Sequence, residues 1–174
     1  DVTARLEQID RAMSHYRQDS ELTRLNQAST GVRILISPSM YEILALSQKM
    51  YRQTHGFFDI TLWPLVEFWG FGTKNQRKTL PQQYETDALK KQTGSHAFVL
   101  SQQGDKSYIL KNKPLAFNLS AIAKGYAVDQ LATLLEQDHR IYNYLVNIGG
   151  EIRTSGHKAE KQPWQVAIEA PIFN

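Results

Sequence analysis

The chain contains 174 residues with a formal net charge of +3, and this length suits one domain or a large piece of one. Its composition is 41% hydrophobic and 21% charged, with ten glycines and six prolines, which excludes collagen-like, coiled-coil and low-complexity chains. The lack of cysteine excludes a disulfide framework, a thiolate zinc site and a cysteine nucleophile. Lysine and arginine form no long run, so nucleic acid is not an expected partner.

The first residues carry an apolar stripe with helical spacing, which predicts an amphipathic helix. The stripe consists of Val2, Leu6, Ile9, Met13 and Tyr16. We expect all of it, including most of Tyr16, to lie in the core. Asp19 and Ser20 are typical of helix caps, so a short second helix is predicted over 21–26.

A strand and a long helix are predicted next. Residues 32–36 are mostly aliphatic, as expected for a short strand. Ser39 and Glu42 have the spacing of a capping box, which predicts the start of a helix. The buried side of this helix would hold Ile43, Leu44, Met50 and Tyr51. Gly56 would end it.

The middle of the chain combines an aromatic segment with a predicted hairpin. Residues 56–72 are rich in phenylalanine and tryptophan, and a helix is predicted within 81–94. Strands are predicted over 96–101 and 107–111, on either side of a glycine-containing turn. A further strand is predicted over 115–119.

The last part of the chain adds one helix and three strands. Ser120 is the predicted cap of the helix that follows it. Strands are predicted over 142–148 and 151–154, joined at Gly149-Gly150, with a final strand over 164–169. Because helices and hairpin strands interleave irregularly, the predicted class is α+β, with a mixed, largely antiparallel sheet flanked by helices.

The residues around Asn118 and Ser120 give the strongest local signal for chemistry. Here a predicted strand leads into a helix whose first turns carry Lys124 and Gly125. The amino end of a helix presents unpaired amides and partial positive charge, so a phosphate is stabilised there, and lysine adds a full charge. The alternative interpretation is an ordinary capped helix with Lys124 in solvent.

A second signal is an acidic residue among aromatics. Asp59 follows Phe57 and Phe58, and further aromatic residues lie downstream. A flat heteroaromatic ligand could stack there while the carboxylate accepts a hydrogen bond from it. The alternative is that the aromatic residues only fill the core. A third candidate, the segment 147–151, is explained by a hairpin turn without a function.

Other reaction classes find no support in the sequence. The five histidines are scattered singly, and neither a Walker motif, a dinucleotide-binding fingerprint nor a serine-hydrolase elbow is present. Magnesium stays open, because it uses few protein ligands together with phosphate oxygens and leaves little trace in a sequence.

Five segments share their order and spacing with one known family. They are SHYRQDSELTRLN, GFFDITLWPLVEFWGFG, LAFNLSAIAKGYAVD, YLVNIGGEIRTSG and PWQVAIEAP. Together they resemble the ApbE family of FAD:protein FMN transferases over nearly the whole chain. The resemblance implies a T-fold-like α+β domain. It also implies Mg²⁺-dependent cleavage of FAD, with transfer of FMN through a phosphoester to a threonine or serine of a target flavoprotein.

The resemblance also assigns residues to roles. The residues implied to contact FAD are Tyr16, Phe57, Phe58, Asp59, Asn118 and Lys124. The carbonyl of Ala121 would bind Mg²⁺, and Lys124 would offset charge during catalysis. The position of Asn118 is usually aspartate in the family, so this chain has a neutral amide where a charge is expected, and its activity is expected to be weakened.

Family members continue beyond the last of these segments with residues that complete the metal site. None of these lies within the 174 residues. We therefore expect residues 1–174 to form the N-terminal and central part of the domain, with little or no turnover alone. Many relatives are exported, which implies the bacterial periplasm and an inner-membrane lipoprotein anchor on an N-terminal segment ahead of Asp1.

Three alternatives to the transferase stay open from the sequence. The first is an FAD pyrophosphatase that releases FMN and AMP without an acceptor. The second is a non-catalytic FAD-binding protein, which the neutral Asn118 favours. The third is a structural domain whose aromatic residues all lie in the core.

Overall fold

The computed structural model describes residues 1–72, 80–168 and 170. The chain folds as two compact units, which are described separately. The N-terminal unit comprises Asp1 and residues 3–123, and the C-terminal unit comprises Val2 and residues 124–174.

Three helices of the N-terminal unit start at side-chain caps. The helices described in this unit are α1 (Val2–Met13), α2 (Glu21–Gln27), α3 (Pro38–Gln53), α4 (Trp63–Phe68) and α5 (Gln83–Lys90), with a 3₁₀ turn η1 (Ser95–Ala97). Side-chain oxygens of Asp1, Ser20 and Ser37 accept from backbone amides in the first turns of α1, α2 and α3. The predicted second helix and its Ser20 cap are confirmed.

The predicted capping box at the start of α3 is wrong by two residues. Ser37, and not Ser39, accepts from the amide of Met40, at 3.1 Å. Pro38 then takes the first helical position, where a missing N–H has no intrahelical partner to lose.

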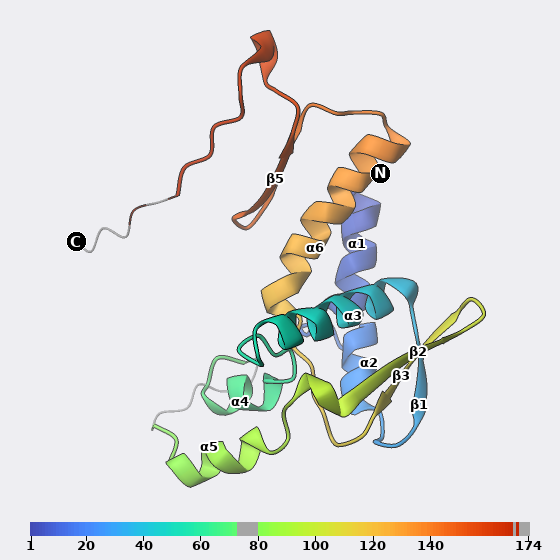
Figure 1. Cartoon of the computed structure of the whole chain (residues 1–174), viewed down its shortest axis with the longest axis vertical. Helices are drawn as coiled ribbons and strands as arrows, with labels where there is room; N and C mark the ends of the chain where they lie inside the picture. Colours follow the sequence, from blue (N-terminus) through green and yellow to red (C-terminus); the bar gives the residue numbers. More distant parts are fainter. Residues whose placement is uncertain (73–79, 169, 171–174) are drawn as a thin grey trace. The chain divides into compact units, whose positions relative to one another are not determined.

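A three-stranded antiparallel sheet has the order β1-β3-β2 (Figure 1). Its strands are β1 (Arg33–Ile36), β2 (Phe98–Gln103) and β3 (Lys106–Lys111). Ile109 of β3 lies opposite Ile34 on one side and Leu100 on the other, and it is fully buried. The predicted hairpin is confirmed with a shorter turn, since Gly104 adopts a φ of 55° and lets the strands extend further.

The core of the N-terminal unit lies between this sheet and α3. Met40, Ile43 and Leu44 of α3 are fully buried, and α3 packs against β3. Phe98 of β2 meets Phe117 edge-on, with ring centroids 5.3 Å apart. Of the predicted buried side of α3, two residues are therefore fully buried. Met50 and Tyr51 are only half-buried.

The N-terminal stripe is buried only in its middle. Ile9 and Met13 are buried, whereas Val2 is 40% and Tyr16 75% exposed. The prediction of a core Tyr16 is wrong because α1 ends at Met13 and Ser14 is extended, with φ −74° and ψ 127°. Tyr16 therefore leaves the face on which a continued helix would have placed it.

The predicted strand over 115–119 is also wrong. Among the described residues it has no strand partner, and its backbone bonds instead to the side chain of Asn26 and the carbonyl of Ile60. These partners satisfy backbone groups that a strand ladder would otherwise satisfy. Leu115, Phe117 and Leu119 are nevertheless buried, as a strand-like alternation requires.

The C-terminal unit contains most of α6 and a hairpin. Its elements are α6 (Ser120–Thr133), whose first four residues lie in the N-terminal unit, a π-helical turn η2 (Leu134–Asp138), β4 (Tyr144–Ile148), β5 (Glu151–Ser155) and a 3₁₀ turn η3 (Ala159–Lys161). Gly149 and Gly150 join the strands with φ values of 56° and 99°, the positive angles that a tight hairpin turn requires. The predicted hairpin is confirmed.

Polar contacts connect this hairpin with α6 and η2. Arg153 of β5 donates to Asp129 of α6 at 2.9 Å, and the Tyr144 hydroxyl donates to Glu136. The predicted strand over 164–169 is not found in its described part, 164–168, where Trp164 donates its indole N–H to the Ser155 carbonyl. Residue 169 lies outside the described residues.

The predicted α+β class is confirmed. All three strand pairings in the two described sheets are antiparallel, and helices accompany both sheets. No helix within residues 1–72 and 80–168 combines the length and apolar character of a membrane span.

Candidate functional site

Hydrogen bonds anchor the aromatic turn after α3, while its Phe57 ring is exposed. The amide of Gly56 donates to the Tyr51 carbonyl at 2.8 Å with a φ of 85°, which ends the helix with a left-handed residue. Phe58 N–H donates to Thr54 Oγ1 at 2.9 Å. Phe57 is 94% exposed, so this ring is not core and is available to a ligand. Phe58 is half-buried beside it.

Asp59 organises the buried end of the same turn. Its Oδ1 accepts from the Thr61 amide at 2.9 Å, the Thr61 hydroxyl at 2.7 Å and the Ser95 hydroxyl at 2.7 Å. Thr61 Oγ1 in turn accepts from the Gly94 amide at 2.6 Å. Asp59 therefore has a structural task that the sequence did not predict. Because all three donors reach Oδ1, Oδ2 is the oxygen with capacity for a ligand donor.

Asn118 lies directly beside this turn. Its amide donates to the Ile60 carbonyl at 2.7 Å. Its side-chain Oδ1 accepts from the Ser120 amide at 2.8 Å. The prediction that Ser120 is the cap is therefore wrong: Ser120 is the first helical residue, and Asn118 supplies the oxygen that satisfies its amide.

The start of α6 thus stands next to the aromatic turn within the N-terminal unit. The first amides of a helix have no intrahelical acceptor and carry partial positive charge. Ser120 and Ala121 are both exposed there. Two predicted parts, the helix start and the Phe57-Phe58-Asp59 turn, are therefore brought together in one unit.

His15, one of the five histidines that are scattered singly in the sequence, also belongs to this surface. Its Nδ1 lies 3.3 Å from Ser120 Oγ. Its ring centroid is 3.9 Å from that of Tyr16 and 4.9 Å from that of Trp63. Partial burial lowers the pKa of His15, although the nearby carboxylate of Glu67 opposes this shift. Its position next to Tyr16 in the chain was the one available signal.

Lys124 is described with the C-terminal unit. Its ammonium lies 3.0 Å from the Glu151 carboxylate and donates to the Gly149 carbonyl at 3.3 Å. The glycine turn at 149–150 therefore has a partner on α6. The sequence analysis noted the segment 147–151, which includes Glu151, and explained it as a hairpin turn without a function. Half-exposed ion pairs of this kind contribute little to stability.

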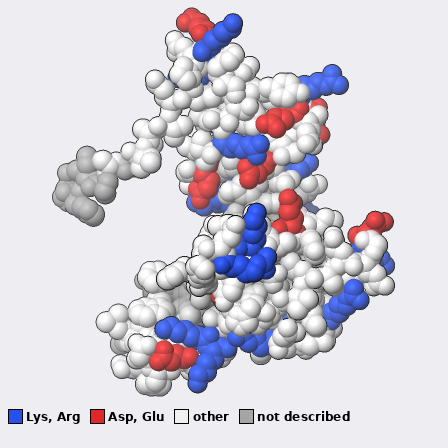
Figure 2. All heavy atoms as spheres, in the orientation of Figure 1, with Lys and Arg blue, Asp and Glu red and all other residues white. Residues whose placement is uncertain are grey.

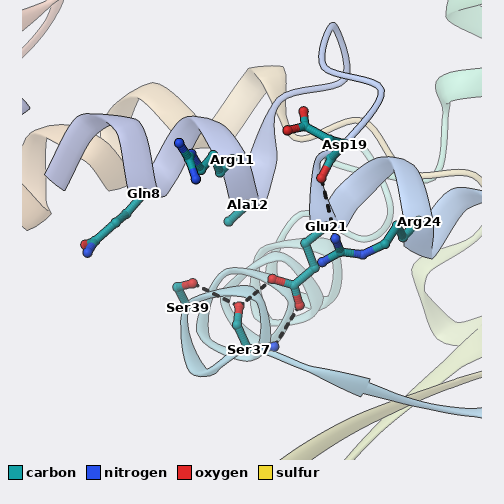
Figure 3. A pocket seen from close by; sticks show the side chains of 8 residues that line it. All are labelled: Gln8, Arg11, Ala12, Asp19, Glu21, Arg24, Ser37 and Ser39. Carbon is teal, nitrogen blue, oxygen red and sulfur yellow. Dashed lines mark hydrogen bonds between the residues drawn. The ribbon is translucent and has the colours of Figure 1, made fainter. Parts of the chain in front are cut away.

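The N-terminal unit also has an open cavity away from the predicted residues. It has a volume of about 550 Å³ and is lined by Gln8, Arg11, Ala12, Asp19, Glu21, Arg24, Ser37 and Ser39 (Figure 3). Its acidic groups already have donors: Glu21 accepts from the Ser37 amide and hydroxyl, and Asp19 from the Arg17 guanidinium. Because both carboxylates of this cavity are already paired within the protein, we place the candidate site at the aromatic turn.

The described residues do not form a magnesium site by themselves. Among them, no group of three or more histidine, aspartate or glutamate side chains is placed to hold a metal ion. The carbonyl of Ala121 is at the start of a helix, where it also serves as an acceptor for the helix. One carbonyl does not fit the octahedral oxygen set that Mg²⁺ prefers.

Charge is mixed over the surface. Figure 2 shows basic and acidic side chains near one another on the visible face. Arg11 forms an ion pair with Glu7, and Arg17 forms one with Asp10.

Comparison with known proteins shows which family the chain resembles. A model of the ApbE family matches residues 1–173. The FAD:protein FMN transferase of Escherichia coli K12 is 37% identical over 171 residues, covering 98% of this chain and 48% of the relative. That of Klebsiella pneumoniae is 40% identical over 172 residues, covering 98% and 49%. The chain thus spans about half the length of the curated relatives it matches.

Solved structures agree with this placement. The flavin transferase ApbE from Vibrio cholerae matches with a TM-score of 0.87 and 37% identity, covering 98% of this chain and 54% of that one. The apo flavinyl transferase ApbE from Pseudomonas stutzeri matches with a TM-score of 0.87 and 34% identity, covering 96% and 54%. The chain belongs to the ApbE family.

Proposed function

We propose that the full-length protein is a flavin transferase, which cleaves FAD and attaches FMN to a threonine or serine of a target flavoprotein. The observation that carries this proposal is the hydrogen bond from Asn118 N–H to the Ile60 carbonyl. It fixes a helix start, suited to phosphate, beside an exposed aromatic turn, suited to a flat ring system. FAD contains both groups in one molecule, and the named relatives act on FAD.

The aromatic residues would bind the ring portions of FAD. Phe57 and Tyr16 are exposed, at 94% and 75%, and flat ligands gain by covering such rings. Asp59 Oδ2 would accept from a ligand N–H or O–H, while Oδ1 stays occupied by its three protein donors. Asn118 can accept or donate through its amide, but it supplies no charge.

The reaction is a displacement at the phosphorus that carries the FMN portion. A bond forms between the acceptor oxygen and this phosphorus, the bond to the AMP oxygen breaks, and the acceptor hydroxyl loses its proton. The start of α6 would stabilise the negative charge through backbone amides. The resemblance implies that Lys124 offsets the same negative charge, and this role stays a prediction.

We also propose that the reaction needs Mg²⁺. Bound Mg²⁺ would neutralise charge on the diphosphate. The described residues do not complete its site. Removal of divalent ions with EDTA from the full-length protein should abolish transfer, and added Mg²⁺ should restore it.

The test of the function mixes full-length protein with FAD, Mg²⁺ and a candidate flavoprotein with an acceptor threonine or serine. Transfer gives a flavin-fluorescent band of the target on a denaturing gel, together with released AMP. AMP without a labelled target would instead identify a pyrophosphatase. Binding without AMP would identify an FAD-binding protein, and no quenching of flavin fluorescence would leave only a structural domain.

The location proposed for the full-length protein is the periplasm, with a lipid anchor in the inner membrane. This rests on the family resemblance alone. Cell fractionation together with metabolic labelling by a fatty acid checks it, and a soluble, unlabelled protein in the cytoplasm would contradict it.

A further inference from the structure

The segment before α6 is held by a side chain from α2. Asn26 Oδ1 accepts from the Phe117 amide at 2.7 Å, and Asn26 Nδ2 donates to the Phe117 carbonyl at 3.0 Å. One carboxamide therefore satisfies both backbone groups of one residue, as a neighbouring strand would. Phe117 itself is fully buried against Phe98.

A buried lysine holds the same segment two residues earlier. Lys111 ends β3 and is 1% exposed. Its ammonium donates to the carbonyls of Leu25 at 2.8 Å and Leu115 at 3.3 Å, and it lies 3.5 Å from that of Asn26. Two of these carbonyls belong to the last turn of α2, where the helix dipole favours a cation. Lys111 thus connects the end of α2 to the start of the segment.

The other side of the segment faces the aromatic turn. Asn118, next after Phe117, donates its amide to Ile60 and accepts from Ser120 through its side chain. Since no strand ladder within the described residues holds 115–119, the place of Asn118 depends on these discrete contacts. A displacement of the Phe117 backbone would therefore also displace Asn118 and the first residue of α6.

We propose that Asn26 and Lys111 are positioning residues: they fix the backbone of 115–117 and thereby place Asn118 and the start of α6 for the ligand. This inference rests on the proposed function, because FAD is the ligand that the placed groups would serve. Neither residue is argued to touch FAD. Both act through the backbone of the segment.

The main test replaces Asn26 by aspartate in the full-length protein. An ionised carboxylate still accepts from the Phe117 amide, but it faces the Phe117 carbonyl without a donor. We expect hydrogen exchange in a peptide covering 115–122 to accelerate, and FAD affinity at neutral pH to fall roughly tenfold, as for one lost buried hydrogen bond. The control is Asn112→Asp, the same charge change at an exposed residue of the same unit.

Lowering the pH should rescue FAD binding by the Asn26→Asp variant, which would not happen if the variant had only lost stability in general. Below the pKa of the new carboxyl, its O–H can donate to the Phe117 carbonyl and restore both bonds. The ratio of FAD affinities between the Asn26→Asp variant and wild type should therefore return toward one as the pH falls. The ratio for the Asn112→Asp control should stay near one throughout.

A second variant, Lys111→Met, removes the ammonium but keeps an unbranched side chain of similar length. It should also accelerate exchange in 115–122 and weaken FAD binding, while a peptide of α3 keeps its protection. If Lys111→Met fails to fold by circular dichroism, the aspartate variant alone decides.

The outcomes separate this inference from the proposed function. Wild-type protein that does not bind FAD refutes the function, and the exchange data then decide whether the two residues position the segment. Unchanged exchange in 115–122 overturns the inference. Accelerated exchange with FAD affinity equal to that of the control overturns it too, since the placement of Asn118 would then not matter to the ligand.

Discussion

At the scale of single residues, residues of the candidate site combine a structural contact with an expected role toward the ligand. Asp59 accepts from the Thr61 and Ser95 hydroxyls with one oxygen, and the other oxygen is the one that the proposed function assigns to a ligand donor. Asn118 caps the amide of Ser120 and bonds to the aromatic turn. Substitutions at such residues change the fold and the site together. Exposed residues such as Phe57 are therefore the cleaner probes of function.

Phe57→Ala is predicted to weaken FAD binding without affecting stability. The ring is 94% exposed, so the free energy of unfolding should change by less than about 0.5 kcal/mol. Loss of ring stacking should cost about 0.5–1.5 kcal/mol of binding free energy. Titration by flavin fluorescence and chemical denaturation measure the two quantities. Phe71→Ala, at an 81% exposed ring without an assigned role, is the matched control and should leave both unchanged.

His15 is predicted to make stability pH-dependent. Burial lowers its pKa from 6.5, so the unfolded chain binds its proton at a higher pH than the folded chain does. Stability is then fully present above pH 6.5 and falls as the pH drops from 6.5 through the lowered pKa. Denaturation at several pH values should show this loss in wild type and not in His15→Gln.

The control for His15 is His139→Gln, which changes an exposed histidine. This variant should keep the wild-type loss of stability on acidification. An equal loss in the His15→Gln variant would show that other groups cause it.

At the scale of elements, glycine geometry decides the β4–β5 hairpin. Gly150 has a φ of 99°, which L-residues rarely adopt, and open space surrounds the position of a Cβ. Gly150→Ala should therefore destabilise the C-terminal unit by about 1–2 kcal/mol through backbone strain alone. Chemical denaturation followed by Trp164 fluorescence measures this change.

Gly125→Ala in α6 is the control, and its expected effect on stability has the opposite sign. Open space also surrounds that position, but its backbone is helical, so alanine should stabilise by up to about 1 kcal/mol. Equal effects of both substitutions would contradict an explanation from backbone angles.

At the scale of the whole molecule, the 174-residue chain is predicted not to respond to magnesium alone. No cluster of potential ligands occurs in residues 1–72 and 80–168, and Ala121 offers a single carbonyl. Thermal unfolding of this chain in Mg²⁺ should match that in a sodium salt of equal ionic strength. A rise in Tm specific to Mg²⁺ would reveal a site that the described residues do not form.

Sequence periodicity and turn chemistry by themselves determined most elements of this protein. The helices that begin after Ser20 and near Pro38, both hairpins and the α+β class follow from local patterns, because caps and glycine turns act over a few residues. The resemblance carried by the five segments gave the family. It also named Phe57, Asp59 and Asn118 as site residues, which the structure brings side by side without testing their roles.

Only the tertiary structure decided how these parts meet. The exposure of Tyr16, the capping role of Asn118 and the absence of a strand partner for 115–119 in the described chain were decided by the packed fold, through contacts such as Asn26 with Phe117. The same holds for His15 beside Ser120 and Lys124 beside Glu151. Local patterns cannot specify such contacts, because a backbone group is satisfied equally by a strand or by one well-placed side chain, and only the packed fold selects between them.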